Sequence, residues 1–447
     1  MIVEKKGYSY NDLTIIPEVI SNISSRSQCS VLNEDNMLPI FASPMTSVVG
    51  CDNLQIFKDN KITPILPRSV DIETRKKYML CGEWVALSLK QFEEIFIEGA
   101  SKLYSGSQYV YKVCVDIANG HMKSLYKKCI KAKELSIQYG YKLVIMTGNV
   151  ANPNTYKYIC TRAIYLNDEI HEYLPAIDYI RVGIGGGSGC ITTSNCSIHY
   201  PQASLIDKCK AVKNELENEE IRISFRESEK KYKHDLPKIV ADGGIRNYDH
   251  VIKALALGAD YVMIGSVFAK CIESAGEKTY KNSNQKLPLR FQTERYKDFY
   301  KDDKGNWWGR YTDDFIKHSL KPYQDEIDKY KKDIERISTD LYLNAYKRYE
   351  DQLKDLVCDK FIGFVDVKFF GMASSDGQIA INGEKTKTAE GITKYLPVEY
   401  TLSAWVENMI SYLRSAMSYT NCKTLKDFIG KPTLIVNSIS EIQVVNK

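Results

Sequence analysis

The stretch Gly183-Ile184-Gly185-Gly186-Gly187-Ser188-Gly189-Cys190 completes an apolar run that begins at Ile177. A glycine-rich turn directly after a buried strand is typical of the βα units of α/β proteins. Seven more short β-rich runs occur along the chain. The eight runs are Leu38–Ser43, Ile62–Arg68, Trp84–Leu89, Tyr111–Ala118, Lys142–Val150, Ile177–Ile184, Lys238–Gly244 and Tyr261–Ser266. Several are almost continuously apolar, as expected of parallel strands buried on both faces.

Helical segments separate most of these runs, and two of them, Ser124–Tyr139 and Tyr248–Leu257, are clearly amphipathic. Strands that alternate with helices predict a parallel sheet of the α/β class, and eight such units predict a closed (β/α)8 TIM barrel. A doubly wound open sheet is the alternative. In the barrel, Gly183–Cys190 becomes the sixth βα loop and lies on the face where barrel enzymes build their active sites.

Three stretches interrupt this alternation: Thr161–Ala176, Asn214–Pro237 and the long segment Lys278–Val365. Within the last, Asp325–Leu356 has apolar residues near helical spacing among dense opposite charges, which indicates an exposed helix or helical hairpin. We therefore predict one barrel formed by residues 1–277 and 366–447. A large, partly helical insertion, residues 278–365, follows the eighth strand.

The composition is that of an ordinary globular protein, because 447 residues with 44% hydrophobic and 26% charged side chains suit one barrel with insertions. The net charge of +5 is small for this length, so it argues against nucleic acid as a partner. No uncharged run is long enough to span a bilayer, and the first ten residues are unlike a signal peptide. Twelve cysteines without C-x-x-C pairs fit free thiols in a reducing cytoplasm.

Cys190 ends the glycine loop, and this position favours a nucleophile. The glycines let the backbone turn tightly, and their N–H groups are suited to cradle phosphate. A cysteine held at the end of such a loop is readily activated for nucleophilic attack. The nearby Thr192 strengthens this interpretation beyond what a glycine-rich loop alone supports.

Three other predicted strand ends carry polar residues or glycines. Asp242, before Gly243-Gly244, is placed to accept hydrogen bonds from ribose hydroxyls or, alternatively, to cap the following helix. Gly265-Ser266 closes the eighth strand, where barrels commonly bind phosphate. Asp116 ends the fourth strand and either orients a second ligand or forms a structural salt bridge.

These motifs, taken in order, resemble the IMP dehydrogenase / GMP reductase family from Tyr8 to about Ile429, outside the three insertions. In that family the glycine loop ends in the catalytic cysteine at the spacing of Cys190, and the onward spacing to Tyr200-Pro201-Gln202 agrees. Other segments also resemble family signatures: Ser43-Pro44-Met45, Gly148-Asn149-Val150, Phe370-Gly371-Met372, Thr388-Ala389-Glu390-Gly391 and Arg414-Ser415-Ala416-Met417-Ser418-Tyr419.

The resemblance implies that Cys190 forms a covalent bond to C2 of a purine mononucleotide, GMP or IMP. It implies that the base contacts Ser43, Met45, Gly371 and Met372 and that the ribose contacts Asp242. Phosphate would lie against Ser188, Gly265 and Ser266, and Gly243 and Gly244 would also bind the substrate. Thr192 and Glu390 would form a proton relay, since a hydroxyl held by a carboxylate can pass a proton.

The resemblance also implies a nicotinamide cofactor, NADPH or NAD, that stacks on the base. Its contacts would be Asp116, Ala118, Asn119 and Gly183. A potassium ion held by the carbonyls of Gly185, Gly187 and Cys190 and a homotetramer are further implications. The insertion 278–365 would lie next to the flap that carries Glu390, where it would gate the site or contact a partner.

Two features favour GMP reductase over IMP dehydrogenase. Dehydrogenases hydrolyse the covalent intermediate with a flap that carries an Arg-Tyr pair, whereas the span from Met372 to Glu390 contains neither residue type. The paired regulatory modules of many dehydrogenases also have no room between Arg68 and Trp84. An IMP dehydrogenase without these modules is the alternative.

Several positions depart from the family pattern: Gly186 stands for proline, Thr46 for aspartate, Phe369 for a tyrosine of many dehydrogenases and Ser194 for a basic residue. They leave room for a divergent purine-nucleotide-binding protein with little catalysis, or for an enzyme that acts on a modified purine nucleotide. His121, beside the expected cofactor, is interpreted as a polar rim residue.

Overall fold

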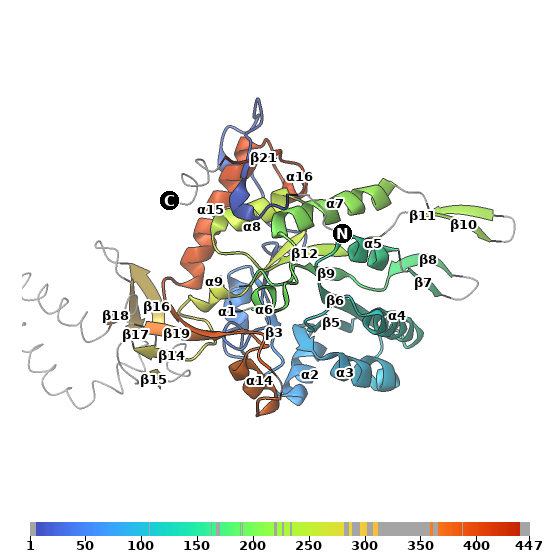
Figure 1. Ribbon diagram of the computed structural model, residues 1–447, viewed down its shortest axis with the longest axis horizontal. Coiled ribbons are helices and arrows are strands. Elements are labelled where there is room, and N and C mark those ends of the chain that lie inside the picture. Colours follow the sequence, from blue (N-terminus) through green and yellow to red (C-terminus); the bar gives the residue numbers. More distant parts are fainter. Residues whose placement is uncertain are drawn as a thin grey trace, which may run out of the picture.

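The computed structural model describes residues 6–106, 108–161, 163–166, 170–187, 189, 191–218, 221–225, 228–232, 235–280, 286–287, 296–301, 307–311, 358–360, 365–386 and 388–438. Its centre is a closed barrel of eight parallel strands (Figure 1). In order around the barrel these are β2 (Ile40–Ala42), β3 (Thr63–Leu66), β4 (Trp84–Leu87), β5 (Val110–Val115), β6 (Lys142–Val150), β9 (Tyr179–Val182), β12 (Lys238–Asp242) and β13 (Tyr261–Ile264). The eight predicted strands and the (β/α)8 fold are therefore confirmed.

Helices surround the barrel, and the two predicted amphipathic segments form α4 and α8. The α-helices are α1 (Leu54–Asp59), α2 (Ile72–Leu80), α3 (Leu89–Glu93), α4 (Lys123–Gln138), α5 (Pro153–Cys160), α6 (Thr192–Cys196), α7 (Gln202–Asn218), α8 (Tyr248–Ala256), α9 (Ser266–Ala269), α14 (Ser375–Asn382), α15 (Leu402–Tyr419) and α16 (Leu425–Phe428). Short 3-10 or π turns occupy η1 (Tyr10–Asp12), η2 (Arg26–Gln28), η3 (Glu94–Glu98) and η4 (Ala100–Lys102). Among the helices of the described ranges, none combines the length and hydropathy needed to cross a lipid bilayer.

Aromatic side chains fill the end of the barrel where the strands begin. Trp84, Tyr179 and Tyr261 are each the first residue of their strand, and their rings pack around Phe41. Phe41 meets Trp84 and Tyr179 edge to face with ring centroids 5.6 and 5.8 Å apart. Such pairs contribute about 0.5–1.5 kcal/mol each beyond the burial of their area. This end is filled with aromatic rings, whereas Asp116 and Asp242 lie at the opposite, C-terminal ends of β5 and β12.

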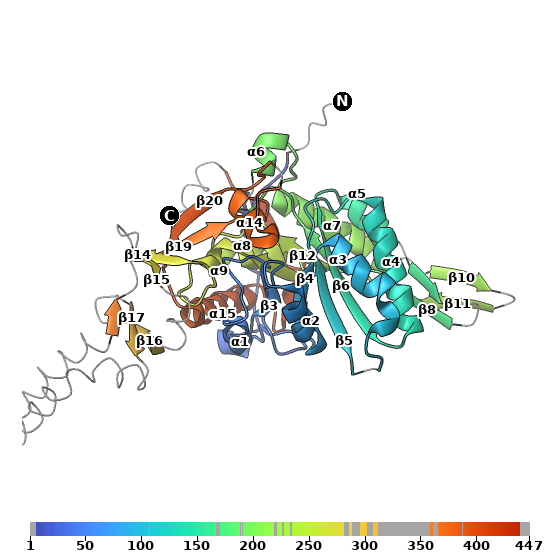
Figure 2. The same cartoon turned by 90° about the horizontal axis from the view of Figure 1, so that it is seen from below.

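The two shorter interruptions are antiparallel hairpins. Within Thr161–Ala176, β7 (Ala163–Leu166) pairs with β8 (Ile170–Pro175). Within Asn214–Pro237, β10 (Ile221–Phe225) pairs with β11 (Ser228–Tyr232), although α7 first continues to Asn218. Both hairpins project from the same side of the barrel (Figures 1 and 2).

The third interruption lies on the other side of the barrel in both views (Figures 1 and 2). Its described part is β-structure. A four-stranded sheet has the order β15 (Lys286–Leu287), β14 (Lys278–Tyr280), β19 (Val365–Phe370) and β20 (Thr393–Pro397). A second sheet joins β16 (Tyr296–Lys301), β17 (Trp307–Tyr311) and β18 (Cys358–Lys360). Outside this interruption, β1 (Leu13–Ile15) pairs with β21 (Leu434–Val436). The predicted helical segment Asp325–Leu356 lies outside the described residues.

Candidate active site

The glycine loop leaves β9 at the C-terminal end of the barrel. Gly183 has a φ of +135°, and a Cβ there would lie 2.2 Å from the carbonyl oxygen of Asp242, so no other residue fits without a shift of the backbone. The N–H of Gly244 donates to the carbonyl of Gly186 at 3.0 Å, which joins this loop to the loop after β12. Ser188 and Cys190, the predicted phosphate contact and nucleophile, lie outside the described residues.

The described neighbours of residue 190 are bonded to the segment that carries Glu390. The N–H of Ile191 donates to the carbonyl of Glu390 at 3.1 Å, and the N–H of Ile392 donates to the carbonyl of Gly189 at 3.0 Å. The N–H of Glu390 in turn donates to Ala373 at 3.0 Å. The three segments predicted to hold the nucleophile, the base and the carboxylate therefore meet. Thr192, the other member of the predicted relay, is the first residue of α6.

Glycines make this close approach of three backbones possible. A Cβ at Gly371 would lie 2.8 Å from the carbonyl oxygen of Gly189, and a Cβ at Gly391 would lie 2.9 Å from the same atom. Neither glycine has a positive φ, so the requirement is for space alone. Any larger residue at either position must push the glycine loop away from the flap.

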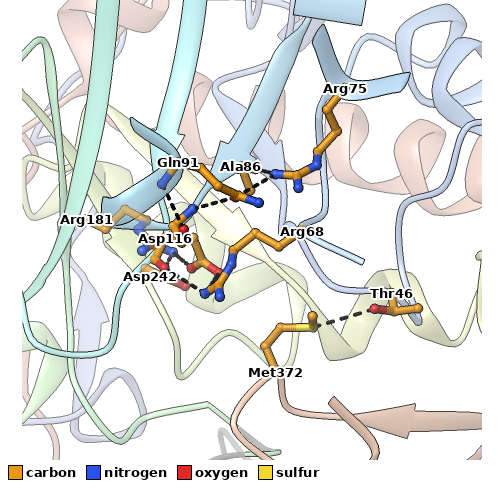
Figure 3. A network of polar contacts seen from close by, with 10 residues as sticks. Thr46, Arg68, Arg75, Ala86, Gln91, Asp116, Arg181, Asp242 and Met372 are labelled. Carbon is orange, nitrogen blue, oxygen red and sulfur yellow. Dashed lines mark hydrogen bonds and ion pairs between the residues drawn. The ribbon is translucent and has the colours of Figure 1, made fainter. Parts of the chain in front are cut away.

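The residues predicted to bind the base and the phosphate come from neighbouring strands. The N–H of Ser43, after β2, donates to the carbonyl of Ile264 in β13 at 2.9 Å. Met45 lies against Gly265, which precedes α9 and its first residue Ser266. A Cβ added to Gly265 would lie 2.9 Å from the Met45 sulfur. Thr46 Oγ1 lies 3.7 Å from the sulfur of Met372, which brings the base-binding segment to this corner (Figure 3).

An ion network lies between the base-side and cofactor-side residues (Figure 3). Arg181 in β9, whose side chain is 5% exposed, places Nη1 3.2 Å from Asp116 Oδ1 and 3.7 Å from Asp242 Oδ2. Asn149 Nδ2 donates to Asp242 Oδ2 at 2.7 Å and to the carbonyl of Gly183 at 2.8 Å. The salt bridge expected as the alternative role of Asp116 is therefore present. The alternative role of Asp242 as a helix cap is wrong, because Asn247 is the N-cap of α8.

Burial and the neighbouring charges shift the pKa values of Asp242 and Arg181 in opposite directions. Burial raises the pKa of the Asp242 carboxyl, and the Arg181 guanidinium and the Asn149 amide act against that rise. Burial alone would lower the pKa of Arg181, but Cys114, Asp116 and Asp242 together raise it. Arg181 therefore stays charged. Its Nε and Nη2 are buried and find no hydrogen-bond partner among the described residues, which is unfavourable for an N–H donor.

The predicted cofactor residues Asp116, Ala118 and Asn119 lie in the loop after β5, and Ala118 and Asn119 are exposed. His121 fixes this loop. Its Nε2 accepts from the N–H of Ala151 at 3.1 Å, so the proton of the neutral ring is assigned to Nδ1, 2.9 Å from Thr155 Oγ1. Burial lowers the pKa of His121, which favours this neutral form.

Two of the three residues predicted to hold a potassium ion, Gly185 and Gly187, lie within the described part of the chain. Thr193 Oγ1 donates to the carbonyl of Gly185 at 3.2 Å, so a potassium ion would use the second lone pair of that oxygen. Gly187 is described and exposed, whereas Cys190 is not described. Within the described ranges, His, Cys, Asp and Glu side chains form no cluster of three or more that is suited to a metal ion.

Sequence reasoning missed Arg181, Asn149 and Arg68 as members of the site. The signal for Arg181 was present, since a charged residue interrupts the apolar strand Tyr179–Val182. Asn149 was noted within a family signature but was given no role in the site. Arg68 carried no signal, because its contact with Asp116 depends on the order in which β3, β4 and β5 pair.

Comparison with known proteins gives consistent matches. Residues 96–290 match the IMP dehydrogenase / GMP reductase domain. A GMP reductase of Helicobacter pylori is 26% identical over 290 residues, which cover 62% of this chain and 75% of that protein. A GMP reductase of Staphylococcus epidermidis is 28% identical, with 61% and 74% covered. An inosine-5'-monophosphate dehydrogenase of Chlorobaculum tepidum is 34% identical over 166 residues, which are 37% of this chain but 26% of that protein.

Proposed function

Because the chain carries an IMP dehydrogenase / GMP reductase domain, we propose that it is a GMP reductase. The reaction would convert GMP, NADPH and a proton to IMP, NADP⁺ and ammonia. The relatives reported above are oxidoreductases of these two kinds, and the two GMP reductases align over 62% and 61% of the chain.

In this proposal the Cys190 thiolate adds to C2 of the purine. The exocyclic amino group takes a proton and leaves as ammonia, so that C2 stays bonded to sulfur. The reduced nicotinamide supplies a hydride to C2. The C2–S bond then breaks, which restores the thiolate and releases IMP. The residues of the chain hold the base and move the proton.

The proton for the departing ammonia would pass through Thr192 and Glu390. The hydrogen bond between Ile191 and the carbonyl of Glu390 supports this role, since it holds the carboxylate-bearing segment beside the residue that precedes Thr192. A hydroxyl and a carboxylate positioned in this way typically contribute about 10²–10⁴-fold to rate.

The composition of the span between Met372 and Glu390 favours a reductase over a dehydrogenase. It contains no arginine or tyrosine, and α14 occupies its first half. An intermediate that meets no activated water is reduced rather than hydrolysed. IMP dehydrogenase, which would convert IMP, NAD and water to XMP, is the second candidate, and the 34% identity to the Chlorobaculum tepidum dehydrogenase favours it.

We extend the proposal to the ligands and the assembly. The base would contact Ser43, Met45, Gly371 and Met372, the ribose Asp242, and the phosphate the loops after β9, β12 and β13. NADPH would lie against Asp116, Ala118, Asn119 and Gly183. We further propose that a potassium ion binds at the glycine loop, that the protein is a cytoplasmic homotetramer and that residues 278–365 form a separate unit. The pairing of β14 with β19, which leads to Gly371, supports a position of that unit beside the flap.

Mass spectrometry of the covalent intermediate tests the mechanism. Mixed with GMP alone, the wild-type chain should gain the mass of GMP less ammonia. Cys190→Ala should gain nothing and should lose turnover, but should still bind GMP in isothermal titration. Cys196→Ala is the matched control, because it removes an exposed thiol six residues away. Turnover by Cys190→Ala at the wild-type rate would refute the mechanism.

A further inference from the structure

Arg68 reaches the cofactor side of the site from the loop after β3. Its Nη1 donates to the main-chain carbonyl of Asp116 at 3.1 Å and lies 3.8 Å from the Oδ2 atom of the same residue. Arg181 holds the other carboxylate oxygen at 3.2 Å. In the barrel order, β3 and β9 lie on either side of β5, each with one strand between. Asp116 is therefore held between two guanidinium groups that come from opposite sides (Figure 3).

The position of Arg68 is costly for folding. Arg75 lies close enough that burial and the charge of Arg68 lower the pKa of Arg75 to about 10. Arg75 itself donates to the carbonyls of Val70 and Ala86, whereas Arg68 Nε is buried without a hydrogen-bond partner in the described part of the chain. Like charges in proximity and an unsatisfied buried N–H both reduce stability. Perturbed ionisable groups of this kind cluster at functional sites.

The residue after Arg68 connects to the base side. Ser69 Oγ lies 2.7 Å from Thr46 Oγ1, which in turn contacts the sulfur of Met372. The dipeptide Arg68-Ser69 thus contacts both the loop expected to hold the nicotinamide and the segment expected to hold the purine.

We propose that Arg68 is a positioning residue for the nicotinamide cofactor. It holds the Asp116 carboxylate, together with Arg181, in the orientation that accepts the hydroxyls of the nicotinamide ribose. The inference rests on the proposed function only in taking a nicotinamide dinucleotide as a ligand, whichever purine is turned over.

The test separates cofactor binding from chemistry. Arg68→Met keeps the length of the side chain and removes its charge and donors. A hydrogen bond to a charged group is worth about tenfold to hundredfold in affinity, so the dissociation constant and KM for the cofactor should rise by about that factor. We expect kcat to change by less than about threefold and the KM for the purine nucleotide to stay constant, since no base contact is lost. Arg68→Lys should recover part of the loss, because an ammonium donates to Asp116 but cannot reproduce the planar fork.

Arg414→Met is the matched control. Arg414 Nε donates to the carbonyl of Cys29 at 3.2 Å, a bond of the same kind that lies in α15, outside the barrel strands and their loops. It should leave both KM values unchanged.

Cofactor affinity is measured by titration of NADPH and of NAD into the full chain, so the result does not depend on GMP turnover. Weaker binding in Arg68→Met supports the inference even if the wild type proves to oxidise IMP. Unchanged cofactor affinity in a folded Arg68→Met overturns it while the proposed function stands. A wild type that binds neither dinucleotide overturns both.

Discussion

Substitution of Gly371 by alanine should slow catalysis through a displacement of known size. A Cβ there would lie 2.8 Å from the carbonyl oxygen of Gly189, whereas ordinary contacts begin at 3.4 Å. The flap and the glycine loop must therefore separate by about 0.6 Å. A misplacement of about 1 Å can cost about a hundredfold in rate, so we expect kcat to fall by about tenfold. Overpacking should cost about 1–3 kcal/mol of stability.

The assay is steady-state oxidation of NADPH in the presence of GMP, compared with Gly140→Ala. Gly140 precedes β6 at the opposite end of the barrel, and its φ of +72° makes an alanine there costly by about 1–2 kcal/mol. No described atom lies within 4 Å of the added Cβ. Gly140→Ala should therefore lose comparable stability and keep kcat. A Gly371→Ala variant with wild-type kcat, or with no larger loss than Gly140→Ala, would refute the reasoning.

Three further predictions concern stability, each measured as a shift of the urea denaturation midpoint. Arg181→Met should cost about 3–5 kcal/mol, because it leaves the largely buried Asp242 without its cation and Asp116 with Arg68 alone, whereas Lys76→Met, which breaks an exposed pair with Glu73, should cost less than about 1 kcal/mol. Burial raises the pKa of Asp242, so the stabilisation of the folded state that comes from its protonation is present below pH 3.8 and is lost as the pH rises through the folded-state pKa. The Asp242→Asn variant should therefore gain stability relative to the wild type as the pH rises through this range. Parallel pH profiles of stability for the two proteins would contradict this. Burial lowers the pKa of His121, so the stabilisation of the folded state by its neutral form is present above pH 6.5 and is lost as the pH falls through the folded-state pKa. The His121→Gln variant should show a smaller fall of stability with pH over this range. An unchanged pH dependence of stability would exclude His121 as its source.

The barrel could be predicted because parallel strands buried on both faces leave a direct trace in the sequence. Val113, Val115, Ile180 and Val182 are apolar on whichever face they point to, so the runs stand out without knowledge of the pairing. The short hairpins left a weaker trace. Ile221-Arg222-Ile223-Ser224-Phe225 alternates as a half-exposed strand should, but the surrounding charges masked that pattern.

Asp116 and Asp242 could be proposed as site residues from the sequence, because one residue type at one strand end suffices for that proposal. Residues whose role depends on which strand ends meet were missed. Arg68 looks like an ordinary loop arginine until the pairing of β3, β4 and β5 places it beside Asp116. The bond between Ile191 and Glu390 joins segments about two hundred residues apart, and no local pattern specifies it.

Absorbance of the reduced nicotinamide tests most directly whether this chain reduces GMP through a thiolate at Cys190. Two parallel reactions are needed, GMP with NADPH and IMP with NAD, with ammonia measured in the first. We expect a loss of absorbance that requires GMP, with one ammonia released for each NADPH oxidised and no such loss in Cys190→Ala. A gain of absorbance with IMP and NAD, without GMP-dependent oxidation of NADPH, would contradict it and identify a dehydrogenase.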